Sequence, residues 1–121
     1  MSLPDRIAAL RTFALSLPDT TEEFPWGERV VKVKGKVFVF MGMGADAPRL
    51  RFSVKLPQRS GALVAEGRAV PTRYGLGKAG WVTFEFGADA LPDDAEVRSW
   101  ALESYRAVAP KRSAARIAVE V

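Results

Sequence analysis

Basic side chains are the groups of this chain with the clearest capacity for chemistry, and they are concentrated in its middle. Residues 29–78 hold eleven Lys or Arg residues against only Asp46 and Glu66, a net charge of +9, whereas the whole chain carries +4. Ammonium and guanidinium groups at this density bind phosphates, because neutralising phosphates releases counterions. The segregation predicts an anionic partner. The residues expected to contact it are Lys32, Lys34, Lys36, Arg49, Arg51, Lys55, Arg73 and Lys78.

Two aromatic residues, Tyr74 and Trp81, accompany these charges in the sequence. Aromatic rings beside cations can stack on unpaired bases, which is a recurring way of holding single strands on a sheet. The alternative is the commoner role of such rings, which is burial in the core. The sequence leaves both interpretations open.

Catalysis and metal binding have little support in the composition, since the chain has no cysteine and no histidine. Thiolate nucleophiles, imidazole bases and the usual zinc ligands are therefore missing. Glu22 with Glu23 suits a polar loop, and Asp93 with Asp94 suits a helix start, so neither pair indicates a catalytic dyad. We expect a nonenzymatic protein with no metal site and no cofactor, although an enzyme using Tyr, Lys or carboxylates remains an alternative.

A glycine-rich segment, Gly75 to Gly80, matches the letter of the G-x-G-x-x-G dinucleotide fingerprint. That fingerprint works between a strand and a helix, because the helix N-terminus meets the pyrophosphate. Here a strand is expected to follow, over residues 81–86. The segment is therefore predicted to be a tight turn, in which Arg73 and Lys78 could meet phosphates.

The elements that position these residues follow from the period of the apolar side chains, which switches between 3.6 and two. Between the first helix and the first strand, residues 18–27 are predicted to form a loop whose Phe24 and Trp26 are buried. In the last helix, Trp100 and Tyr105 fall on one apolar stripe and are expected to be buried. The predicted elements are a helix over 4–16, strands over 29–34, 37–43 and 49–55, a helix over 57–66, a short strand within 70–80, a strand over 81–86 and a helix over 93–109.

This order predicts an α+β fold, a two-layer α-β3-α-β2-α sandwich with a mainly antiparallel sheet and helices on one face. The other face would then be open, and alternation along the strands places basic residues on it or at its rim. The expected basic positions on this open face are Lys32, Lys34, Arg49, Arg51 and Lys55.

The length of 121 residues fits one domain, which we place at residues 1–112, followed by a tail at 113–121 whose order stays open. The longest apolar run, Val37 to Met43, is far shorter than the roughly 20 residues that span a bilayer. No signal peptide is expected at the N-terminus. We therefore expect a cytoplasmic monomer that does not associate with membranes.

Several stretches together resemble the MmcQ/YjbR family, in order and spacing, across roughly residues 5–112. They are Leu17 to Gly27 (LPDTTEEFPWG), Val33 to Phe38 (VKGKVF), Tyr74 to Lys78 (YGLGK), Gly80 to Val82 (GWV) and Ser104-Tyr105. The resemblance implies an α-β3-α-β2-α fold and a proposed DNA-binding role for a double-wing arrangement of strands and loops. It implies no catalytic residues.

The leading functional hypothesis is nonenzymatic binding of nucleic acid, namely DNA, with low sequence specificity through the basic sheet face and adjoining loops. The alternative is a module that binds an anionic protein or a small anion on the same face. A third possibility is that the charges serve only solubility and block pairing at sheet edges.

Overall fold

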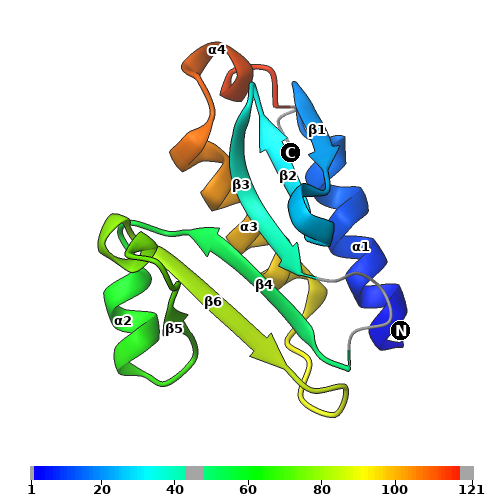
Figure 1. The fold of residues 1–121 in the computed structure, drawn as a ribbon, viewed down its shortest axis with the longest axis vertical. Helices are drawn as coiled ribbons and strands as arrows, with labels where there is room; N and C mark the ends of the chain where they lie inside the picture. Colours follow the sequence, from blue (N-terminus) through cyan, green and yellow to red (C-terminus); the bar gives the residue numbers. More distant parts are fainter. Residues whose placement is uncertain (1, 43–47, 118–121) are drawn as a thin grey trace.

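A single antiparallel sheet of six strands forms the centre of the protein (Figure 1). The computed structural model describes residues 2–42 and 48–117, except for the side chain of Trp26. The strands lie in the order β1-β2-β3-β4-β6-β5, and all neighbours are antiparallel. The strands are β1 Thr20–Glu23, β2 Arg29–Val33, β3 Lys36–Gly42, β4 Leu50–Lys55, β5 Val70–Pro71 and β6 Trp81–Phe86. The helices are α1 Leu3–Ser16, α2 Ser60–Ala65, α3 Asp94–Val108 and α4 Lys111–Ala114, with 3-10 turns η1 Pro25–Gly27 and η2 Leu76–Ala79.

Two long helices, α1 and α3, lie together behind this sheet and form the second layer (Figure 1). Trp100 of α3 is completely buried, with its ring stacked 4.0 Å from that of Phe84 on β6. Tyr105 packs edge-on against Phe38 of β3, at 5.3 Å between ring centroids. The predicted α+β class, the antiparallel sheet, the placement of both long helices on one face and the burial of Trp100 and Tyr105 are confirmed.

The sheet is divided between β3 and β4, because these strands pair only at Val39 with Val54 and at Phe40 with Ser53. In contrast, β4 and β6 pair along six positions, from Leu50 with Phe86 to Lys55 with Trp81. On both sides of the short contact, β3 and β4 diverge (Figure 1). The sheet therefore consists of two halves, β1-β2-β3 and β4-β6-β5.

A serine of α3 joins the two halves at one end of the short contact. The Ser104 hydroxyl donates to the Phe38 carbonyl at 2.6 Å and accepts from the Lys55 backbone N–H at 2.8 Å. Continuation of the β3–β4 register by one residue would place Phe38 opposite Lys55, so the hydroxyl bridges strands that no longer bond directly. Because Ser104 is fully buried, this bridge satisfies two backbone groups that water cannot reach.

The first strand, β1, lies in the segment for which the sequence predicted a loop. Its four residues pair with β2, and Glu22 points toward α1, where Arg11 donates to its carboxylate at 2.6 Å. The prediction failed because turn-forming residues flank a strand too short to show a period. Phe24 was expected to be buried and is 55% exposed, lying near the Arg29 guanidinium, while the Trp26 side chain lies outside the described part of the chain.

Apart from α4, Lys111–Ala114, for which no helix was predicted, the remaining helices and strands match the predicted ones with altered bounds. The helix expected over 57–66 is only Ser60–Ala65, and the short strand expected within 70–80 is the two-residue β5. The strand expected over 37–43 is β3 as far as Gly42, and Met43 lies outside the described residues.

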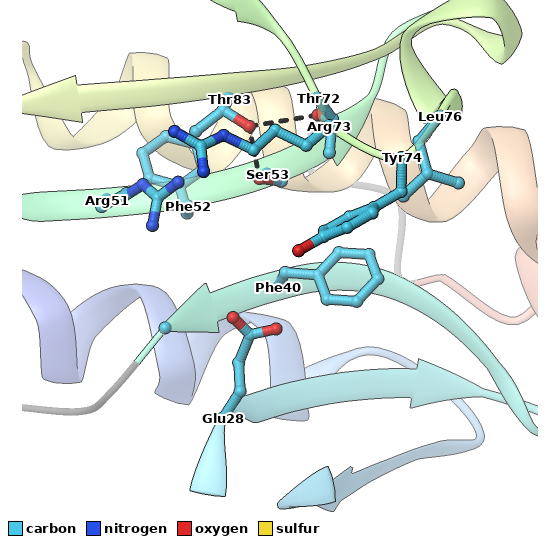
Figure 2. A pocket seen from close by; sticks show the side chains of 11 residues that line it. Glu28, Phe40, Arg51, Phe52, Ser53, Thr72, Arg73, Tyr74, Leu76 and Thr83 are labelled. Carbon is cyan, nitrogen blue, oxygen red and sulfur yellow. Dashed lines mark hydrogen bonds between the residues drawn. The ribbon is translucent and has the colours of Figure 1, made fainter. Parts of the chain in front are cut away.

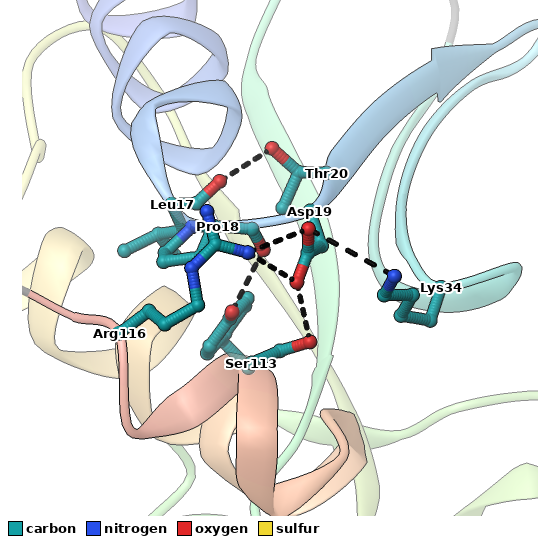
Figure 3. Close-up of polar contacts among 8 residues, drawn as sticks. Leu17, Pro18, Asp19, Thr20, Lys34, Ser113 and Arg116 are labelled. Carbon is teal, nitrogen blue, oxygen red and sulfur yellow. Dashed lines mark hydrogen bonds and ion pairs between the residues drawn. The ribbon is translucent and has the colours of Figure 1, made fainter.

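A polar corner ties the residues after α3 to the body of the domain (Figure 3). Asp19, whose φ is 62°, accepts hydrogen bonds from the Ser113 hydroxyl at 2.7 Å and from the Arg116 guanidinium at 2.9 Å. Lys34 Nζ lies 4.0 Å from the same carboxylate, and the Tyr105 hydroxyl donates to the Pro18 carbonyl at 2.7 Å. The chain is thus held to the domain beyond residue 112, while residues 118–121 of the predicted tail lie outside the described residues.

This corner makes the stability of the fold depend on pH. The Ser113 hydrogen bond, with help from Arg116 and Lys34, lowers the pKa of Asp19 in the folded protein. A carboxyl with a lowered folded pKa stabilises the fold at pH values above its unfolded pKa of about 4, and this contribution is lost as pH falls through the folded value. We expect Asp19→Asn to destabilise the protein near neutral pH and to have less effect in acid.

Urea unfolding of the wild type and the variant between about pH 7 and pH 3 measures this convergence. Glu66→Gln is the matched control, since Glu66 is exposed and forms no ion pair with a described residue. A stability difference between wild type and Asp19→Asn that stays constant over this range would contradict the role given to Asp19.

Candidate nucleic-acid interface

The sheet face turned away from α1 and α3 carries the polar positions of the central strands. Along β4, Arg51, Ser53 and Lys55 alternate with apolar residues that belong to the core. The register with β6 brings Glu85 beside Arg51 and Thr83 beside Ser53. The alternation predicted for the strand over 49–55 therefore places these side chains on the open face.

A pocket of about 270 Å³ opens on this face where β3 and β4 separate (Figure 2). It occupies the place where Gly42 would oppose Arg51 if the β3–β4 pairing continued. Its lining comes from both halves of the sheet and from the segment before η2. The lining residues are Glu28, Phe40, Gly42, Arg51, Phe52, Ser53, Thr72, Arg73, Tyr74, Leu76 and Thr83.

Three hydroxyl groups line one wall of the pocket and connect its strands. The Ser53 and Thr83 hydroxyls are 2.7 Å apart, and the Thr72 and Thr83 hydroxyls are 3.1 Å apart (Figure 2). A hydroxyl can both donate and accept, and its hydrogen can rotate to suit the partner. This wall can therefore hydrogen-bond to ligand groups of either polarity.

Two guanidinium groups, those of Arg51 and Arg73, lie at the same end of the pocket (Figure 2). The Arg51 side chain is 55% exposed and lies 3.7 Å from the Glu85 carboxylate, which Arg49 also approaches at 3.5 Å. Exposed ion pairs of this kind contribute only about 0 to 1 kcal/mol, so an incoming phosphate can replace the carboxylate. Glu28 supplies a single carboxylate at the opposite wall.

Tyr74 stands at the rim of the pocket and is 97% exposed. Its φ is 62°, a left-handed conformation that costs a bulky residue about 1 to 3 kcal/mol. In Figure 2 its hydroxyl points toward the side of the pocket that holds Glu28. The fold thus holds a large aromatic ring in solvent, in a strained backbone position, without a packing contact that explains it.

The segment that carries Tyr74 is fixed at both ends by backbone contacts. Thr72 N–H donates to the Trp81 carbonyl at 3.1 Å, and Gly77 N–H donates to the Thr72 carbonyl at 3.2 Å. At Gly80, with φ of 92°, a Cβ atom would lie 2.6 Å from Pro57 Cα, so only glycine allows this approach. The glycine-rich segment is a tight turn followed by a strand, as predicted, and Arg73 and Tyr74, which come directly before it, line the pocket.

The structure divides the eight basic residues predicted to bind the partner. Four of them form ion pairs: Lys32 with Glu23 at 3.1 Å, Lys34 with Asp19 at 4.0 Å, and Arg49 and Arg51 with Glu85 at 3.5 and 3.7 Å. The other four form no ion pair with any residue of 2–42 and 48–117, and they are Lys36, Lys55, Arg73 and Lys78. Of the eight, only Arg51 and Arg73 line the pocket.

The two rings considered for stacking have opposite surroundings. Trp81 is only 8% exposed, and its ring packs 5.3 Å from that of Phe40, which lines the pocket, so it offers no free face for a base. Tyr74 has its ring in solvent. Four lining residues were not predicted as site residues, and they are Phe40, Ser53, Thr72 and Thr83. For Ser53 and Thr83 the available signal was a small hydroxyl side chain on the outward-facing positions of a strand.

The described residues contain no group of three or more acidic side chains placed to hold a metal ion. None of their helices is long and apolar enough to cross a membrane.

The fold defines a class of protein, an α+β domain whose antiparallel sheet is covered by helices on one face. The sequence matches the YjbR family over residues 15–107, and the chain belongs to this family. The predicted resemblance is thereby confirmed. The fold is similar to the crystal structure of Deinococcus radiodurans protein DR2400, described as a DUF419 domain, with a TM-score of 0.62 and 28% sequence identity. The similarity covers 79% of this chain and 72% of that one, whereas the search of curated proteins gave no match.

Proposed function

We propose that this protein is a nonenzymatic module that binds nucleic acid on the open sheet face, with low sequence specificity. The observation that carries the proposal is the pocket at the β3–β4 division, where Arg51 and Arg73 lie beside the exposed ring of Tyr74. Guanidinium groups hold phosphates by charge and by paired hydrogen bonds, and an exposed ring stacks on bases. The pocket thus offers groups that suit both the phosphates and the bases of a nucleic acid.

Further cations extend this surface beyond the pocket. Lys55 ends β4 on the open face, and Lys78 lies in η2 beside the segment that carries Arg73. Neither has an acidic partner among the described residues, so each can neutralise a phosphate without first losing an ion pair. Lys36, also without such a partner, begins β3 at the far end of that strand from Gly42. We assign it a peripheral role.

Low sequence specificity is supported by the side chains that the chain lacks. Direct reading of adenine in the major groove uses the paired donor and acceptor of Asn or Gln. The sequence has no Asn and a single Gln, Gln58, which lies after β4 and outside the pocket. The hydroxyl groups of the pocket wall can each donate or accept a hydrogen bond, so they discriminate only weakly between the edges of different bases.

The salt dependence of binding tests this function. If at least two phosphates are neutralised, the slope of log K against log salt on duplex DNA is expected to be steeper than about −1.8, at about 0.9 per contact. Fluorescence anisotropy with a labelled duplex at several salt concentrations measures the slope. Absence of binding at low salt, or a flat response, would contradict the proposal.

The second candidate is capture of a small anion or an acidic protein segment on the same face. It is favoured by one observation, the confined pocket with two guanidinium groups at one end. A small anion would occupy only the arginine end, so its binding would not depend on Tyr74. Competition of the labelled duplex by inorganic phosphate, at concentrations too low to act through ionic strength alone, would favour this candidate.

A further inference from the structure

Two neighbouring pockets meet at the same pair of arginines. The pocket at the β3–β4 division has a volume of about 270 Å³, and a second pocket of about 280 Å³ lies toward β5. Both are lined by Arg51, Arg73 and Thr83. The two guanidinium groups therefore stand at the boundary between two recesses of similar size. An anion bound there has a recess on each side.

This arrangement matches the repeat of a single strand, in which each phosphate joins two nucleosides and so has a base on either side of it. We propose that the pocket at the β3–β4 division takes one unpaired base stacked on Tyr74, with the adjoining phosphate on Arg51 and Arg73. The assignment rests on the proposed nucleic-acid function and adds to it a preference for single strands. The next nucleotide along the strand would then reach the second pocket, whose lining also includes Glu85 and Arg68, the latter paired with Glu96 at 3.0 Å.

The position of Tyr74 is the main support for a stacked base. Its ring is almost completely in solvent, yet the backbone holds it at a positive φ that few bulky residues adopt. An aromatic ring with a free face can stack on any unpaired base, because every base has a π-face. The hydroxyl wall of Ser53, Thr72 and Thr83 lies within the same pocket and can meet the edge of the base.

A duplex cannot use this pocket in the same way. Bases in a duplex are stacked on their neighbours and paired along their edges, so entry into a recess requires extrusion from the helix. The duplex retains only the phosphate contacts to the cations. The two forms of DNA should thus depend equally on Arg73 and differently on Tyr74.

The test compares Tyr74→Ala with the wild type on two probes. One is a labelled oligodeoxythymidine of about 12 nucleotides, within the site sizes usual for single-strand-binding domains. The other is the same strand annealed to its complement. We expect Tyr74→Ala to lose about tenfold in affinity for the single strand, as stacking on one base provides, and less than about twofold for the duplex.

Two further variants complete the comparison. Tyr74→Phe keeps a ring and should retain most of the single-strand affinity, whereas Arg73→Ala should weaken both probes. Because Tyr74 is 97% exposed, its replacement removes no core packing, and thermal unfolding checks this.

The outcomes separate the inference from the function on which it rests. Equal binding of both probes by the wild type, or equal losses on both in Tyr74→Ala, would overturn the stacked base and leave nucleic-acid binding standing. If the wild type binds neither probe at low salt, both proposals fail. A single-strand preference that disappears in Tyr74→Ala and returns in Tyr74→Phe is the result expected.

Discussion

Replacement of Lys55, Arg73 and Lys78 by glutamate should remove most of the affinity for DNA and reduce the slope of log K against log salt by about 2.7 on a duplex. The reason is that each phosphate contact contributes about 0.9 to this slope. None of the three cations forms an ion pair with a described residue, so their loss leaves no buried carboxylate without a partner. Anisotropy titrations over a range of salt concentrations measure both quantities.

The control is a second triple replacement of equal charge on another surface. Arg106 lies near the end of α3, and Lys111 and Arg112 lie in α4; all three are exposed and have no ion pair with a described residue. Either replacement changes the net charge from +4 to −2, so long-range repulsion from DNA is matched. Equal losses in the two variants, once both are shown to be folded, would mean that net charge alone holds the DNA and that the proposed surface is wrong.

Trp100→Ala is expected to lower the free energy of unfolding by about 3 to 5 kcal/mol, as other large core truncations do. The side chain is fully buried, and its ring contacts three aromatic rings of the sheet. Since a whole domain is stable by only about 5 to 15 kcal/mol, this single change removes a large fraction of the total. Urea denaturation measures the loss.

Two companion variants make the measurement specific to packing. Trp100 Nε1 is buried without a hydrogen-bond partner among the described residues, so Trp100→Phe removes an unsatisfied donor and should cost less than its change in volume suggests. Arg106→Ala, on the exposed side of the same helix, should change stability by less than about 0.5 kcal/mol. A loss below about 1 kcal/mol for Trp100→Ala would place the aromatic stripe outside the core.

The fold was largely predictable from the sequence because its long elements have strong periods. The stripe that contains Trp100 and Tyr105 faces the sheet, and the alternation over residues 49–55 separates core from open face. Strand β1 could not be predicted, because its four residues lie between turn-forming residues and are too few to show an alternation of polar and apolar side chains. Its existence depends on pairing with β2, which is a tertiary interaction.

The candidate site was predictable only in part, because acidic residues that are distant in the sequence lie beside its basic residues in the fold. Scarcity of acids within residues 29–78 suggested that the cations there lack partners, but Glu23 of β1 and Glu85 of β6 reach Lys32 and Arg51 across the sheet. The net charge of a sequence segment therefore does not tell which of its cations have acidic partners on neighbouring strands. The pocket itself depends on where two strands stop pairing, and no local pattern marks that point.

The short contact between β3 and β4 has a mechanical consequence. Each half of the sheet is stiff along its own ladder, whereas the join between them consists of two residue pairs and the Ser104 bridge. We expect a small rotation about this join to widen or narrow the pocket while the hydrogen bonds within each half stay intact. The width of the pocket is thus expected to change more easily than the spacing of strands within either half. A recess with one compliant dimension can accept bases of different size at similar cost.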